Sequence, residues 1–87
     1  MVGWRVEFSS EAVRDLQFLE TEAAKRIVKK LESITPYPQR HLSKIVGADD
    51  YKLRIGDYRV IIILVHGSKT IFVERVGHRK NVYKSLR

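Results

Sequence analysis

The sequence predicts an α+β fold in which one mostly antiparallel sheet packs on a helical hairpin. Apolar and polar residues alternate at both ends of the chain, which indicates strands, and helical spacing of apolar residues fills the interval between them. The expected order is β-α-α-β-β-β, followed by a short C-terminal helical segment. With 87 residues and no linker-like stretch, the chain is expected to form a single domain over residues 1–87.

The first strand and first helix are predicted from alternation and capping. Apolar residues alternate with charged ones over residues 2–8, which predicts a strand. Ser9 or Ser10 then provides an N-cap, and Glu11 falls in the first turn, where the helix dipole favours an acid. A change in the phase of the apolar residues near residues 20–22 predicts a tight turn to a second helix. Pro36 ends that second helix.

Residues 39–50 are expected to be a connecting loop, and three strands are expected at residues 51–55, 58–65 and 70–76. The middle strand is apolar on both faces, so both faces need cover. The helices cover one face. The other face is then either left partly open for a partner, or Ile61 and Ile63 lie beneath the C-terminal segment at residues 80–86.

The turn between the first two of these strands carries an unusual set of cations. Alternation places Lys52 and Arg54 on one face of their strand. If Gly56 and Asp57 form a two-residue loop, Arg54 lies directly opposite Arg59. Like charges opposite each other destabilise a sheet by roughly 0.2–1 kcal/mol. This arrangement predicts a binding site for phosphate.

The distribution of charge supports a polyanionic partner. Residues 1–39 carry six cations and six acids, whereas residues 40–87 carry eleven cations and four acids and so account for the net charge of +7. Nucleic acid is the first candidate and an acidic protein the second. The absence of cysteine, of a signal peptide and of a membrane-spanning run favours a cytoplasmic location.

The available side chains favour one kind of chemistry. The sequence has no glycine-rich phosphate loop and no spacing typical of a metal site, and carboxylates are scarce in the basic half. Cleavage of RNA by its own 2′-hydroxyl needs only positioned cations and proton transfer, because the substrate supplies the nucleophile. Lys52 is the candidate general base, since the neighbouring Arg54 and Arg59 favour its neutral form.

A second group of candidates follows the last strand. Gly77 is expected to break that strand, and a four-residue turn at residues 66–69 places Val76 opposite Arg59. The bend at His78 and Arg79 then falls beside the cations of the hairpin. His78 can act as a general acid, since histidine titrates near neutral pH. Tyr83, four residues after Arg79, could stack on a base or hydrogen-bond to a phosphate.

The combination of YKLRIGDYRVI, a following strand and VGHRKNVYK resembles the RelE family of the RelE/ParE toxin–antitoxin superfamily over essentially the whole chain. The resemblance implies a ribosome-dependent endoribonuclease that cleaves mRNA in the A site by 2′-hydroxyl attack, with neither a metal nor another cofactor. It also implies a RelB-like antitoxin that covers the sheet, with the ribosome and mRNA as the other partners and no membrane.

The resemblance also implies a role for each residue that stands at a position of the family motif. Lys52 resembles the first family lysine of the hairpin strand, and Arg54 stands where the best-known members have a second lysine. Arg59 resembles the family arginine that follows the hairpin tyrosine and binds phosphate, and Arg79 resembles the arginine that stabilises the transition state. Tyr83 resembles the C-terminal tyrosine of the family, although it follows Arg79 more closely than in the best-known members. The expected catalytic residues are Lys52, Arg59, His78, Arg79 and Tyr83. The expected RNA-binding residues are Lys44, Arg54, Lys80 and Lys84.

Two other functions fit the same pattern. One is a ParE-like inhibitor that binds DNA gyrase without nuclease chemistry, and the other is an inactive binder that retains the fold. Structural roles also stay open for single residues. Lys52 and Arg54 can form an ordinary solvated strand face, and the ring of Tyr83 can pack on the sheet.

Overall fold

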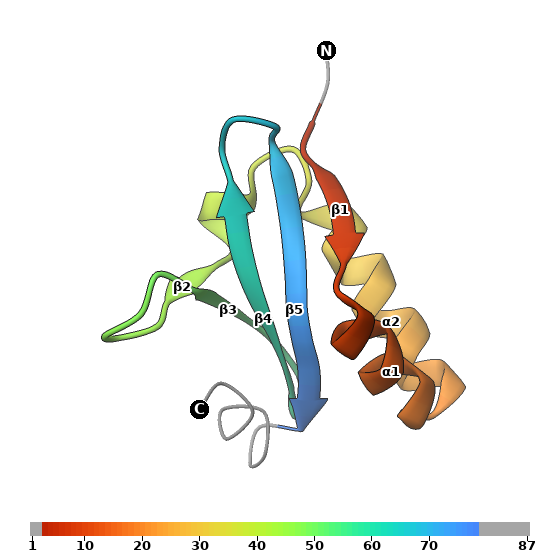
Figure 1. Cartoon of the computed structure of the whole chain (residues 1–87). Helices are drawn as coiled ribbons and strands as arrows, with labels where there is room; N and C mark the ends of the chain where they lie inside the picture. Colours follow the sequence, from red (N-terminus) through yellow and green to blue (C-terminus); the bar gives the residue numbers. More distant parts are fainter. Residues whose placement is uncertain (1–2, 79–87) are drawn as a thin grey trace.

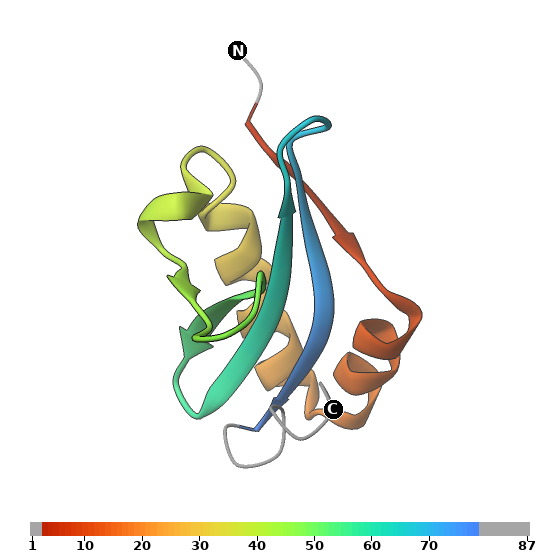
Figure 2. The ribbon, with the colours of Figure 1, turned by 60° about the vertical axis from the view of Figure 1, so that its left-hand side comes forward.

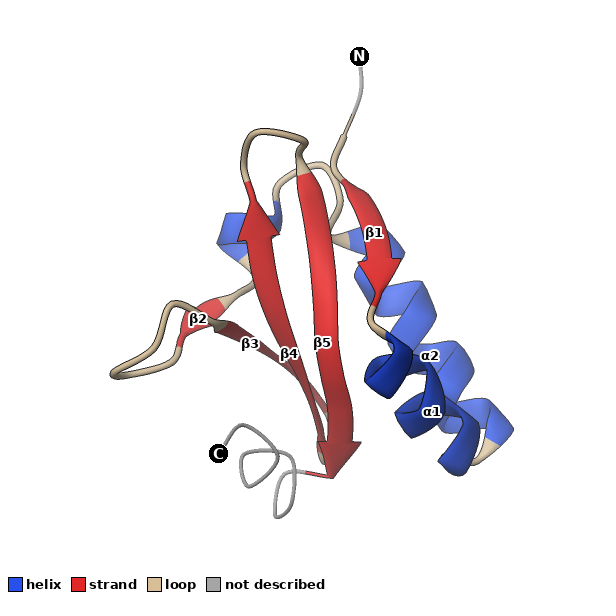
Figure 3. Cartoon of the chain, viewed as in Figure 1, coloured by secondary structure: helices blue, strands red, loops and turns tan. Residues whose placement is uncertain are grey.

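The computed structural model describes residues 3–78. Two helices lie against a five-stranded sheet (Figures 1 and 3). The elements in chain order are β1 (Arg5–Phe8), α1 (Ser10–Phe18), α2 (Thr21–Ser33), the 3₁₀ turn η1 (Pro38–Arg40), β2 (Ser43–Lys44), β3 (Tyr51–Ile55), β4 (Tyr58–Val65) and β5 (Thr70–His78). This arrangement confirms the predicted fold class.

The sheet has the strand order β1-β5-β4-β3-β2. Every neighbouring pair is antiparallel except β1 and β5, which run parallel with Val6 opposite Ile71. Strand β1 forms one edge of the sheet, and the helical hairpin follows it in the chain. The chain then enters the sheet at the opposite edge with β2, and the last strand, β5, pairs with β1. The turned view shows α2 behind the two long strands (Figure 2).

The hydrophobic core lies between the helices and one face of the sheet. Side chains of the two helices and of the last three strands form one buried cluster. Its members from the helices and the end of α2 are Ala12, Ile27, Leu31 and Ile34. Its members from the strands are Leu53, Ile55, Val60, Ile62, Leu64, Ile71, Val73 and Val76. The predicted packing of the helical hairpin on one sheet face is therefore confirmed.

Helix α1 begins as capping chemistry predicts. The Ser9 hydroxyl accepts a hydrogen bond from the Ala12 amide at 3.0 Å, and Glu11 occupies the first turn. The first strand, however, starts later than expected. Trp4 donates its amide to the Thr35 carbonyl at 2.9 Å instead of pairing in the sheet, so β1 begins only at Arg5.

The expected loop at residues 39–50 contains a strand that the sequence did not reveal. The two-residue strand β2 pairs antiparallel with β3, with Ser43 opposite Lys52 and Lys44 opposite Tyr51. A strand of two residues is too short to produce a recognisable alternation, so its pattern is invisible in the sequence.

The last strand differs from the prediction in length and in register. Gly77 does not break it; β5 continues through Gly77 to His78. The predicted pairing of Val76 with Arg59 is also wrong, since Val76 pairs with Val60 and Gly77 pairs with Arg59. A β-bulge explains the shift, because Glu74 is an extra residue between the partners of Ile61 and Ile62.

The sheet face opposite the helices carries Ile61 and Ile63 on the central strand. Ile61 is fully buried, and Ile63 is partly buried. The predicted C-terminal segment at residues 80–86 lies outside the described residues. No helix within residues 3–78 is long and apolar enough to cross a membrane.

Candidate functional site

The β3–β4 hairpin has the predicted geometry. Ile55 pairs with Tyr58 and Arg54 pairs with Arg59, so Gly56 and Asp57 form a two-residue loop. Gly56 has a φ of +59°, which suits a tight hairpin turn with glycine at its first central position. The register that brings the two arginines together is therefore fixed by the turn.

Three cations share the sheet face opposite the helices. Leu53 and Ile55 point into the core, so their strand neighbours Lys52 and Arg54 point the other way. Arg59, directly opposite Arg54, lies on the same face. We call Lys52, Arg54 and Arg59 the hairpin cations. Their grouping confirms the placement expected from the alternation.

Arg59 is oriented by the turn that it follows. Its Nη1 donates to the Gly56 carbonyl at 3.4 Å and to the Tyr58 carbonyl at 3.3 Å. These long bonds hold the guanidinium beside the turn while leaving its other N–H groups for a ligand. The described part of the chain gives none of the hairpin cations a carboxylate partner, since its three ion pairs involve other cations.

Lys44 lies apart from the hairpin cations. It pairs with Tyr51, whose ring packs against the core, so Lys44 belongs to the helix side of the sheet. Its Nζ is 3.9 Å from an Asp49 carboxylate oxygen and 6.0 Å from the centre of the Tyr51 ring. The structure therefore does not bring Lys44 into the same surface as Lys52.

His78 lies at the expected end of the sheet, on the face opposite the hairpin cations. It pairs with Tyr58, and the two rings meet edge-to-face with their centroids 6.2 Å apart. Since Tyr58 packs against the core, His78 is on the helix side, across the sheet from Arg54 and Arg59. The bulge causes this placement, because one extra residue in β5 reverses the face of every residue after it.

The remaining candidates follow β5. Arg79, Lys80, Tyr83 and Lys84 lie outside the described residues. Their roles stay predictions from the sequence.

The bulge residue Glu74 forms a carboxyl pair that the sequence did not predict. Its carboxyl is close to that of Asp50, which precedes β3, and Glu74 Oε1 is buried with no hydrogen-bond partner. Burial is the larger cause and the adjacent Asp50 carboxyl the smaller one, and together they raise the pKa of Glu74 to about 7. No sequence signal reveals the pair, because the two acids are brought together by a bulge.

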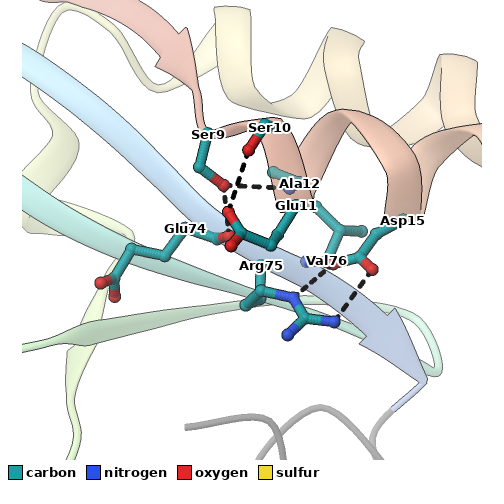
Figure 4. A network of polar contacts seen from close by, with 8 residues as sticks. All are labelled: Ser9, Ser10, Glu11, Ala12, Asp15, Glu74, Arg75 and Val76. Atoms are coloured by element: carbon teal, nitrogen blue, oxygen red, sulfur yellow. Dashed lines mark hydrogen bonds and ion pairs between the residues drawn. The ribbon is translucent and has the colours of Figure 1, made fainter.

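A second unpredicted contact joins α1 to the edge of β5 (Figure 4). Asp15 accepts hydrogen bonds from Arg75 Nε at 2.9 Å and Arg75 Nη2 at 3.1 Å, and from the Val76 amide at 2.9 Å. The hydrogen bond to Asp15 raises the pKa of Arg75. Ser9 donates its hydroxyl to the Glu74 carbonyl at 2.6 Å. These contacts provide hydrogen-bond partners for the Glu74 carbonyl and the Val76 amide of β5, beyond the point where β1 ends.

The hairpin cations are suited to binding phosphate. Guanidinium groups form paired, charge-assisted hydrogen bonds to phosphate oxygens, and Lys52 adds a compact charge beside them. Across residues 3–78, no three acidic, histidine or cysteine side chains gather closely enough to hold a metal ion. The hairpin cations supply fixed positive charge at this face.

Comparison with known proteins identifies the family. The profile of the ParE toxin of type II toxin–antitoxin systems matches residues 6–83. The chain belongs to the RelE/ParE superfamily of type II toxins. A relative in this superfamily, RelE1 of Methanocaldococcus jannaschii, is 24% identical, and the match covers 94% of this chain and 97% of the relative.

Solved structures of the superfamily share the fold. The toxin–antitoxin complex RelBE2 from Mycobacterium tuberculosis contains a chain with 26% identity and a TM-score of 0.83; the match covers 90% of this chain and all of that one. The RelB–RelE antitoxin–toxin complex from Methanococcus jannaschii contains a chain with 27% identity and a TM-score of 0.68, with 92% and 98% covered.

Proposed function

We propose that this toxin is an mRNA endoribonuclease that acts in the ribosomal A site and so inhibits translation. Membership of the RelE/ParE superfamily supports the class of protein, and the resemblance of the hairpin and the VGHR turn to the RelE family supports the activity. Such a toxin acts in the cytoplasm, where ribosomes are found, and residues 1–87 form its toxin domain.

The observation that carries the proposal is the group of hairpin cations on the sheet face opposite the helices. Arg54 and Arg59 lie directly opposite each other, which costs sheet stability, and no carboxylate of the described residues compensates them. A ligand rich in phosphate removes this repulsion when it binds. RNA is such a ligand, and the net charge of +7 favours its approach to the protein.

The proposed reaction uses the 2′-hydroxyl of the substrate as the nucleophile. Lys52 accepts its proton, and the oxygen attacks the adjacent phosphorus to form a 2′,3′-cyclic phosphate. The bond from phosphorus to the 5′-oxygen of the next nucleotide breaks, and that oxygen takes a proton from water. Arg54 and Arg59 bind the non-bridging oxygens. By resemblance, Arg79 stabilises the transition state and Tyr83 contacts the substrate. The position of His78 across the sheet does not favour it as the general acid.

We also propose a RelB-like antitoxin as the partner of this toxin in the cell. The two solved complexes above contain a RelB antitoxin with their toxins. The basic surface of residues 40–87 favours an acidic partner in the same way that it favours RNA.

The test compares mRNA on translating ribosomes by primer extension after addition of purified protein. We expect cleavage at A-site codons by the wild type and a loss on the order of 100-fold for Arg59→Ala, since removing one transition-state donor has that effect. Arg14→Ala is the matched control, because Arg14 is an exposed arginine on α1, a helix that packs against β5 and β1. Equal activity of the Arg59 and Arg14 variants would exclude the proposed role of Arg59.

A ParE-like inhibitor of DNA gyrase is the second candidate, and the match to the ParE toxin profile favours it. The two functions differ in their products. Intact mRNA on ribosomes together with gyrase-dependent DNA breaks would identify the inhibitor. Intact mRNA without DNA breaks would identify an inactive binder.

A further inference from the structure

Helix α2 brings a fourth cation to the end of the hairpin. Arg26 Nη1 lies 3.9 Å from the position that a Cβ on Gly56 would occupy. Arg26 is exposed, whereas the next residue, Ile27, is fully buried in the core. Packing of Ile27 therefore fixes the flank of the helix from which Arg26 reaches the turn.

The hairpin turn lies between Arg26 and the hairpin cations. Arg54 and Arg59 approach the turn from the open face, and Arg26 approaches from the helix side. Gly56 has no side chain, and its φ of +59° makes any other residue strained at this position. Gly56 therefore places no side chain between the Arg26 guanidinium and the turn beside which the Arg59 guanidinium lies.

No carboxylate neutralises Arg26 within the described part of the chain. The acid four residues before it on α2, Glu22, forms no ion pair with it, and neither does Asp57 in the turn. An arginine with five N–H donors and no acceptor close by is well suited to a phosphate group.

We propose that Arg26 binds the RNA backbone together with Arg54 and Arg59, so that the RNA-binding surface crosses the end of the hairpin onto α2. This inference rests on the proposed function, because it extends the same phosphate-binding surface. The ligand class is a single-stranded ribonucleotide chain, whose successive phosphates can contact both sides of the turn.

The test measures binding of a single-stranded oligoribonucleotide at several salt concentrations. The probe carries 2′-O-methyl groups throughout, so it cannot be cleaved. For Arg26→Ala we expect the slope of log K against log salt to fall by about 0.7, and the affinity at moderate salt to fall about fivefold, which corresponds to the loss of one phosphate contact. Arg26→Lys should keep the slope, since it keeps the charge.

Lys29→Ala is the matched control. Lys29 is also exposed on α2, one turn further on, but it lines the open groove between α1 and α2 rather than the hairpin. Its removal changes the net charge equally and should leave the slope nearly unchanged. Both alanine variants should fold, because alanine is the strongest helix former and neither side chain is buried; thermal melting checks this.

The outcomes separate the two proposals. If Arg59→Ala lowers the slope while Arg26→Ala behaves like Lys29→Ala, the inference about Arg26 is wrong and the RNA site stands. An Arg26 variant that binds RNA normally but loses affinity for the antitoxin would also refute it, in favour of a protein contact. If the wild type shows no salt-dependent binding, both proposals fail.

Discussion

Arg54 and Arg59 lie opposite each other because the two-residue turn between β3 and β4 fixes the register of these strands. The repulsion between them costs roughly 0.2–1 kcal/mol, which is small beside the stability of a domain of this size. Substituting either arginine should therefore change binding far more than folding. The same pair could be predicted from the sequence because a two-residue loop determines which residues face each other.

Glu74 should make the stability of the protein depend on pH. Its pKa is 4.5 when exposed and about 7 in the folded protein, so the folded state binds the proton more tightly. The free energy of unfolding should therefore fall as the pH rises from about 4.5 to about 7. The charged group that acts on Glu74 is the Asp50 carboxyl, whereas the neighbouring Arg75 forms its ion pair with Asp15.

Chemical denaturation at several pH values across this range measures the effect. Glu74→Gln cannot titrate, so its stability should fall less over the same interval, and the difference from the wild type isolates the contribution of Glu74. If the two pH profiles are parallel, the Glu74 carboxyl is not perturbed as described.

At the scale of elements, the register of β5 shows where prediction from the sequence stops. The turn at residues 66–69 correctly pairs Val65 with Thr70, and the pairing holds as far as Ile62. Beyond Glu74, every partner is displaced by one residue. A bulge adds one residue without a turn signal or a change in composition, so the predicted register of β5 beyond Glu74 was wrong by one residue.

Asp15 should contribute strongly to the attachment of α1 to β5. Asp15→Ala removes three hydrogen bonds and leaves the Arg75 guanidinium and the Val76 amide unpaired. We expect a loss of about 2 kcal/mol in the free energy of unfolding and a decrease of about 10 °C in the melting temperature. Thermal unfolding followed by circular dichroism measures both.

The control for Asp15 is the exposed ion pair between Arg5 and Glu7, at 3.1 Å. Glu7→Ala removes one partner from a pair whose side chains are 67% and 49% exposed, so the change should be below about 1 kcal/mol. Similar losses for the two variants would mean that Asp15 does not have the structural role assigned to it.

At the scale of the whole molecule, the two faces of the sheet carry different kinds of residue. One face holds the core with both helices, and the other carries the hairpin cations. The fold class and the hairpin cations followed from periodicity and one tight turn. Strand β2, the bulge and the approach of Arg26 to Gly56 did not, since each depends on contacts between segments far apart in the chain.

The central claim is that the toxin cleaves mRNA through the 2′-hydroxyl of its substrate. The most direct measurement follows mRNA cleavage on ribosomes that carry one of two mRNAs. These mRNAs differ only by 2′-O-methylation of the A-site codon. We predict that the wild-type protein cuts the unmodified mRNA in the A site and leaves the methylated one intact. Cleavage of both mRNAs would contradict attack by the 2′-hydroxyl, and cleavage of neither would contradict the nuclease function itself.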